Sequence, residues 1–129
     1  MQLGMIGLGR MGANMVRRLM RGGHACAAYD PSASAVSALA REGAIGAGTP
    51  HDLVATLTPP RVVWMMVPAA AVDRVIEELV PLLGKGDTLV DGGNTHFVDD
   101  LARAARLTPR GIHYLDVGVS GGVWGLERG

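Results

Sequence analysis

The sequence predicts an α/β domain built on a doubly wound parallel sheet of about six strands, with helices on both faces. Short apolar runs, typical of buried strands, alternate along the chain with stretches whose apolar residues recur every three or four positions, as in amphipathic helices. The connections between them are short, which favours parallel strands joined by right-handed crossovers. The 129 residues suffice for one hydrophobic core, so we expect a single domain over residues 1–129.

The expected strands are the short apolar runs of the sequence. They cover residues 3–6, 25–29, 44–46, 62–67, 88–90 and 112–117. Pro59-Pro60 predicts a turn that leads into the fourth run. Runs this short and this apolar are typical of strands that are covered on both faces of a parallel sheet.

The first two expected helices cover residues 10–21 and 31–41, where apolar side chains fall one helical turn apart. Gly22-Gly23 is a stop signal for the first helix. Asp30 followed by Pro31 is typical of an N-cap with proline in the first turn, so Asp30 is a candidate cap of the second helix.

Three further helices complete the predicted alternation. Thr49 is the expected N-cap of a short helix that runs to Leu57, with a proline and an aspartate in its first turn. Apolar residues at helical spacing from residue 72 predict a fourth helix that ends at Gly84 as a C-terminal cap. Residues 98–107 are expected to form the fifth.

The composition excludes several classes of protein. Glycine supplies 19 residues without the period of collagen, and the 48% apolar content argues against a disordered chain. Twelve basic residues balance twelve acidic ones, so we expect neither a nucleic-acid partner nor an anionic membrane surface. The sequence shows no secretion signal or membrane span, and we expect a cytoplasmic protein. The four histidines lack metal-ligand spacing, so we expect no metal. The single cysteine, Cys26, is expected to be buried as a small apolar side chain.

The strongest local motif follows the first expected strand and opens the first expected helix. It reads Gly7, Leu8, Gly9, Arg10, Met11, Gly12. In a Rossmann-type dinucleotide turn, the first glycine permits the bend, the second lets the backbone approach the pyrophosphate, and the third lets helix and strand pack closely. The alternative is a plain strand-to-helix turn. The strand before the motif and the helix after it favour dinucleotide binding.

Asp30 ends the second expected strand, where dinucleotide-binding domains place a carboxylate for the adenosine ribose. Such a carboxylate accepts hydrogen bonds from the ribose hydroxyls and repels the 2′-phosphate of NADP. No Arg or Lys lies in residues 31–34 to neutralise that phosphate, so we expect NAD in preference to NADP. This role is compatible with helix capping.

Two more glycine-rich segments follow expected strands, at residues 91–95 (Asp-Gly-Gly-Asn-Thr) and 116–122 (Asp-Val-Gly-Val-Ser-Gly-Gly). The carboxyl ends of parallel strands present such loops to a ligand. The second segment offers a hydroxyl and successive backbone N–H groups for an anion. Taken singly, the first could be a turn with a helix cap and the second an ordinary loop.

Together these motifs, with Tyr29 before Asp30 and with Gly125 and Arg128 after the last loop, resemble the decarboxylating 6-phosphogluconate dehydrogenases. The wider β-hydroxyacid dehydrogenase group, including 3-hydroxyisobutyrate dehydrogenase, resembles the first and last motifs equally well. The Asp-Gly-Gly-Asn loop favours the phosphogluconate branch, and Asp30 makes the chain similar to its shorter, NAD-dependent members.

The resemblance implies oxidation of 6-phosphogluconate at C3 with hydride transfer to NAD, followed by decarboxylation to ribulose 5-phosphate. It implies that Asn94 contacts both substrate and nicotinamide, and that the substrate carboxylate is held by a short run of residues. That run is Ser120, Gly121 and Gly122. It further implies that Met11, Val67 and Pro68 line the dinucleotide site.

The family's general base, a lysine, and general acid, a glutamate, come from a helical segment beyond the last loop. Lys85, the only lysine in the chain, lies in a Gly-Lys-Gly turn and is a poor substitute. We therefore expect a cofactor domain without its helical catalytic and dimerisation domain, with little turnover by itself, from a protein that is a homo-oligomer at full length. The alternatives are another β-hydroxyacid dehydrogenase and a non-enzymatic dinucleotide-binding module.

Overall fold

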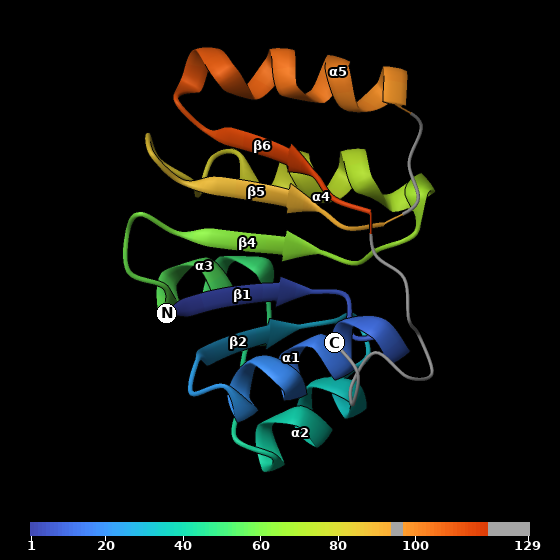
Figure 1. The fold of residues 1–129 in the computed structure, drawn as a ribbon, viewed down its shortest axis with the longest axis vertical. Helices are drawn as coiled ribbons and strands as arrows, with labels where there is room; N and C mark the ends of the chain where they lie inside the picture. Colours follow the sequence, from blue (N-terminus) through green and yellow to red (C-terminus); the bar gives the residue numbers. More distant parts are fainter. Residues whose placement is uncertain (94–96, 119–129) are drawn as a thin grey trace.

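The structure, a computed structural model, describes residues 1–93 and 97–118. A parallel sheet with the strand order β3-β2-β1-β4-β5-β6 forms its centre (Figure 1). Strands β2 and β3 are added on one side of β1, and strands β4, β5 and β6 on the other. The direction in which strands are added therefore reverses between the neighbouring strands β1 and β4. Ligands of doubly wound sheets bind in the crevice at such a reversal, beyond the carboxyl ends of the strands. The predicted fold class is confirmed.

The strands and helices alternate as the sequence predicts. The strands are β1 (Gln2–Ile6), β2 (Ala25–Tyr29), β3 (Ile45–Gly46), β4 (Val62–Met65), β5 (Thr88–Asp91) and β6 (His113–Asp116). The helices are α1 (Arg10–Arg21), α2 (Ala33–Arg41), α3 (Pro50–Thr56), α4 (Val72–Leu79) and α5 (Phe97–Leu107), with 3-10 turns η1 (Ala69–Ala71) and η2 (Thr108–Arg110). Within the described ranges, no helix is long and apolar enough to cross a membrane.

Each face of the sheet has its own hydrophobic core, because successive side chains of a strand point to opposite faces. On β1, Leu3 and Met5 pack with α1 and α2, while Ile6 packs with α3 and α4. Figure 1 shows α1 and α2 in front of the sheet, and α3 and α4 behind it. Leu107 of α5 belongs to the α3 and α4 core. Cys26 is buried in the other core, as expected, and burial raises the pKa of its thiol.

Several predicted elements were too long, most clearly at the ends of α4 and β4. Helix α4 ends at Leu79 rather than at Gly84, because Pro81 has no backbone N–H to donate to the carbonyl four residues earlier, which interrupts the regular hydrogen bonding of the helix. Strand β4 ends at Met65 rather than at residue 67, and the chain that follows leaves the sheet for the loop before η1.

The predicted helix caps were correct for α3 and wrong for α2. The hydroxyl of Thr49 accepts the backbone N–H of Asp52 at 3.0 Å, as expected for the cap of α3. The cap of α2 is Ser32, whose hydroxyl accepts the N–H of Ala35 at 3.4 Å, and α2 begins at Ala33 rather than at residue 31. The carboxylate of Asp30 makes other contacts, described below.

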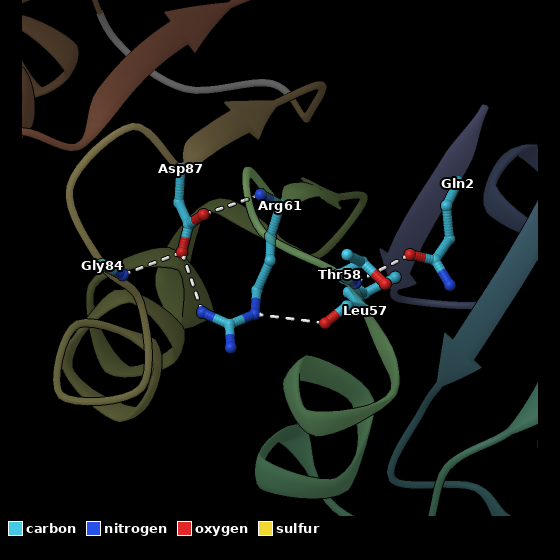
Figure 2. Close-up of polar contacts among 6 residues, drawn as sticks. All are labelled: Gln2, Leu57, Thr58, Arg61, Gly84 and Asp87. Atoms are coloured by element: carbon cyan, nitrogen blue, oxygen red, sulfur yellow. Dashed lines mark hydrogen bonds and ion pairs between the residues drawn. The ribbon is translucent and has the colours of Figure 1, made fainter.

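A buried carboxylate joins two loops, which lie at the amino ends of β4 and β5, opposite the ligand edge (Figure 2). Asp87 accepts the backbone N–H of Arg61 at 2.6 Å and that of Gly84 at 2.8 Å, and its Oδ2 lies 3.2 Å from Nη1 of Arg61. Nearby, Gln2 accepts the N–H of Thr58 at 2.8 Å. These contacts fix the chain on either side of the cis Pro59-Pro60 bond, the turn predicted to lead into β4.

Candidate functional site

Two hollows meet at the carboxyl edge of the sheet, on either side of Gly9. The larger, of about 760 Å³, extends from Gly7 and Asp30 to α4. The smaller, of about 380 Å³, extends from Gly12 towards the loop after β5. Gly9 lines both, together with Met66, Val67 and Pro68 of the loop after β4. Together the hollows form a groove with two arms that meet over the amino end of α1.

The turn between β1 and α1 requires two of its glycines for structural reasons. Gly7 has φ = +98°, a conformation that side chains rarely adopt, and a Cβ there would collide with the carbonyl oxygen of Met66. A Cβ at Gly12 would collide with the carbonyl oxygen of Gly7. The first glycine therefore makes the bend and the third brings helix and strand together, as the motif predicts.

Gly9 is different, because the fold does not require a glycine there. Its φ of −64° and ψ of −176° suit any residue, and a Cβ would meet no atom within 4 Å. This open space is the point at which the two arms of the groove meet. A glycine that neither the backbone nor the packing needs is explained by a ligand that approaches the main chain closely.

The amino end of α1 is left open for such a ligand. Gly9 occupies the N-cap position without a side-chain hydrogen bond, and the first turn contains no acidic residue. By contrast, Ser32 and Thr49 cap α2 and α3 with their hydroxyls. The first backbone N–H groups of a helix have no partner within it, and together with the helix dipole they favour an anion.

Asp30 stands at the end of β2, on the wall of the larger hollow. Its Oδ2 accepts the backbone N–H of Leu8 at 2.8 Å, and its Oδ1 accepts the N–H of Ser32 at 2.8 Å. The carboxylate thereby links the glycine turn to the start of α2 and is held in one orientation. Carboxylate oxygens have further lone pairs, so hydroxyl groups of a ligand can still donate to them.

A second fixed carboxylate supports the loop after β5. Asp91 is fully buried, and its Oδ1 accepts the backbone N–H of Gly93 at 2.9 Å. The hydroxyl of Tyr114, on the neighbouring strand β6, donates to Oδ2 of Asp91 at 3.2 Å. Gly92 and Gly93 line the smaller hollow, so this network shapes one wall of it.

Most of the predicted dinucleotide residues lie around the groove. Gly7, Gly9, Asp30, Val67 and Pro68 line the larger hollow, and Gly9, Met11, Gly12, Val67 and Pro68 line the smaller one. Leu8 differs, because its side chain is in the core and its N–H binds Asp30. Arg10 is exposed as the first residue of α1 and lines neither hollow. Four predicted residues lie outside the described ranges: Asn94, Ser120, Gly121 and Gly122.

Sequence reasoning missed several residues of this site. Met66 lines both hollows, and Arg74 and Glu78 of α4 line the larger one. The position of Met66 next to Val67 could have indicated it, whereas no sequence signal distinguishes Arg74 and Glu78 from other charged residues on a helix surface. Within the described residues, no group of three or more His, Cys, Asp or Glu side chains could hold a metal ion.

Comparison with known proteins agrees with this geometry. Residues 2–129 match the family model described as the NAD binding domain of 6-phosphogluconate dehydrogenase. The chain is 47% identical, over its whole length, to an NAD(+)-dependent, decarboxylating 6-phosphogluconate dehydrogenase of Haloferax volcanii. The match covers 42% of that relative. It is also 40% identical, over 98% of its length, to a decarboxylating 6-phosphogluconate dehydrogenase of Treponema pallidum. That match covers 27% of the relative. The chain thus spans less than half the length of these curated relatives.

Solved structures share the same arrangement. The 6-phosphogluconate dehydrogenase of Plasmodium falciparum superposes on the whole chain with a TM-score of 0.91 at 27% identity, over 29% of its own length. The 3-hydroxyisobutyrate dehydrogenase of Mycobacterium tuberculosis superposes on 96% of the chain with a TM-score of 0.87 at 29% identity, over 42% of its own length. The fold is therefore common to both branches of the β-hydroxyacid dehydrogenases that the sequence resembles.

Proposed function

The chain belongs to the family of NAD-binding domains of 6-phosphogluconate dehydrogenase, and we propose that residues 1–129 are the cofactor domain of an NAD-dependent, decarboxylating enzyme. The observation that carries the proposal is Gly9, which lies where the two arms of the groove meet and which the fold itself does not require. A dinucleotide has the matching shape, with two nucleoside arms joined by a pyrophosphate.

In this proposal, different residues of the groove bind different parts of the dinucleotide. The open amino end of α1 receives the pyrophosphate beside Gly9. Asp30 accepts hydrogen bonds from the adenosine ribose in the larger hollow. The nicotinamide arm lies in the smaller hollow, beside Met11 and the loop that Asp91 supports.

When bound, NAD would accept a hydride from C3 of 6-phosphogluconate, and loss of CO2 from the resulting β-keto acid would give ribulose 5-phosphate. The chain's own contribution is to position the substrate. Asn94 would contact substrate and nicotinamide, and Ser120, Gly121 and Gly122 would hold the substrate carboxylate, as the resemblance implies. Proton transfer would require an acid and a base from the remainder of the enzyme.

The proposed preference for NAD over NADP rests on the charge around Asp30. Beyond Asp30, between α2 and β3, lies a further hollow of about 380 Å³. Among the described residues that line it, Asp30 alone carries a charge. A 2′-phosphate directed towards this side would meet a fixed carboxylate and no cation.

The test is to titrate the chain with NAD and NADP by isothermal calorimetry, alongside two glycine-to-alanine variants. We expect Gly9→Ala to melt at the wild-type temperature, because its Cβ would contact no protein atom. We expect it to lose NAD binding, because that Cβ would enter the space proposed for the ligand. Gly84→Ala, at the opposite edge of the sheet, is the matched control, since its Cβ would meet no atom closer than 4.0 Å. Wild-type NAD affinity in Gly9→Ala would refute the site, and equal NAD and NADP affinities in the unmodified chain would refute the preference.

A 3-hydroxyisobutyrate-type activity is the second candidate, favoured by the superposition on the Mycobacterium tuberculosis enzyme. A substrate screen on the full-length protein separates the two. Reduction of NAD with 6-phosphogluconate but not with 3-hydroxyisobutyrate is the expected result, and the reverse would establish the second candidate.

A further inference from the structure

The α4 wall of the larger hollow carries two charged side chains that the dinucleotide motif does not explain. Arg74 and Glu78 both line the hollow. They are four residues apart on α4, so they lie side by side on one face of the helix. Both are exposed, and within the described part of the chain neither has an ion-pair partner.

Their neighbours on α4 are directed elsewhere. Asp73 binds Arg103 of α5 at 2.9 Å, and Glu77 lines a separate groove beside Arg106. The face that carries Val75, Ile76 and Leu79 is buried. Of the four charged residues from 73 to 78, Arg74 and Glu78 are therefore the pair that borders the larger hollow.

The lining of the hollow also suits a flat, apolar group. Pro31, Val67, Ala71 and Val75 are among the lining residues, and their side chains offer no hydrogen bond. With the ribose held at Asp30, the group attached to the ribose enters this part of the hollow. That group in a dinucleotide is the base.

We propose that Arg74 and Glu78 select adenine as the base of the bound dinucleotide, an inference that rests on the function proposed above. The guanidinium of Arg74 stacks on the face of the base, and the carboxylate of Glu78 accepts a hydrogen bond from the 6-amino group. Hypoxanthine carries a carbonyl oxygen at position 6, which is an acceptor, and it would face the carboxylate of Glu78 without a hydrogen between them. The edge contact is therefore selective and the stacking contact is not.

The experiment compares NAD with nicotinamide hypoxanthine dinucleotide, which differs at the base alone, by calorimetric titration of the chain. We expect the unmodified chain to bind NAD about tenfold more tightly, the effect of one hydrogen bond to a charged acceptor. Glu78→Gln should bring the two affinities close together, because an amide can both donate and accept. Glu77→Gln, the adjacent glutamate that lines a different groove, is the matched control and should keep the wild-type ratio.

The Arg74→Ala variant tests the stacking contact. It should weaken both dinucleotides by a similar factor and leave their ratio unchanged. If it weakened NADP far more than NAD, Arg74 would be contacting the 2′-phosphate, and its assignment to the base would be overturned. Failure of NAD to bind at all would refute the proposed function, whereas tight binding of both dinucleotides with equal affinity would refute the role of Glu78 alone.

Discussion

Replacement of Asp87 by Asn tests whether the carboxylate in Figure 2 stabilises the fold. The side chain is buried, with a residue exposure of 1%, and its two oxygens take backbone N–H groups from Arg61 and Gly84 as well as the Arg61 guanidinium. Asn has the same shape but places an amide NH2 where one of these acceptors was. At least one donor is then left facing another donor, and the guanidinium loses its counter-charge.

The expected cost follows from these contacts. A hydrogen bond to a charged group contributes about 1.5–3 kcal/mol, and breaking a buried ion pair costs about 3–5 kcal/mol when one charge is left behind. Because the Arg61 side chain is 21% exposed and water can partly replace its partner, we expect the lower part of this range, about 3 kcal/mol. In a domain of this size, that corresponds to a melting temperature lower by about 10 °C.

The measurement is urea unfolding followed by circular dichroism from pH 7 down to pH 3. Burial raises the pKa of Asp87, but the N–H groups of Arg61 and Gly84 and the Arg61 guanidinium hold it below its ordinary value of 3.8. The stabilisation is then fully present above that value and is lost as the pH falls through the lower pKa of the folded state. The gap between wild type and variant should therefore be constant above about pH 5 and narrow only towards the acid end. Asp52→Asn, at an exposed aspartate, is the control. If the free energy of unfolding of Asp87→Asn at pH 7 were within about 0.5 kcal/mol of the wild-type value, the reasoning would be refuted.

Three other positions give simpler predictions. Gly12→Ala should destabilise the domain by about 2 kcal/mol or more, since its Cβ collides with a backbone oxygen, and a wild-type thermal melt would contradict that packing. Thr49→Ala should cost about 1 kcal/mol by loss of the cap to Asp52, whereas Thr49→Ser should cost little in the same melts. The Cys26 thiol is buried with a raised pKa, so Ellman's reagent should label it slowly at pH 8 until urea is added, and rapid labelling of the folded chain would contradict its burial.

Local patterns predicted most of the fold, because the patterns and the packing agree. Helix α1 covers the predicted residues 10–21, since its apolar spacing and the Gly22-Gly23 stop signal point to the same boundaries. The end of α4 was wrong because the apolar spacing continues through residues 80–83, although Pro81 interrupts the helix. Where two local signals conflict, the backbone constraint decides, because a missing N–H cannot be compensated by apolar spacing.

The site was predictable only where its chemistry lies in consecutive residues. The glycine turn and Asp30 are visible in the sequence because a motif and a strand end mark them. Arg74 and Glu78 are not, since their place in the same hollow as Asp30 depends on the order of the strands and on the packing of α4 against the sheet. The same limit applies to Tyr114, which reaches Asp91 only because β5 and β6 are paired in register.

The start of α1 shows why local rules and function separate at this site. A Ser, Thr, Asp or Asn at position 9 would cap the helix and stabilise it by about 1 kcal/mol, and the open space around Gly9 would accept such a side chain. Elsewhere the chain uses this kind of cap, with Ser32 on α2 and Thr49 on α3. A capping side chain at position 9 would occupy the N–H groups and the space that we propose for the pyrophosphate. Glycine at this position therefore costs some helix stability and leaves open the space that the proposed anion site requires.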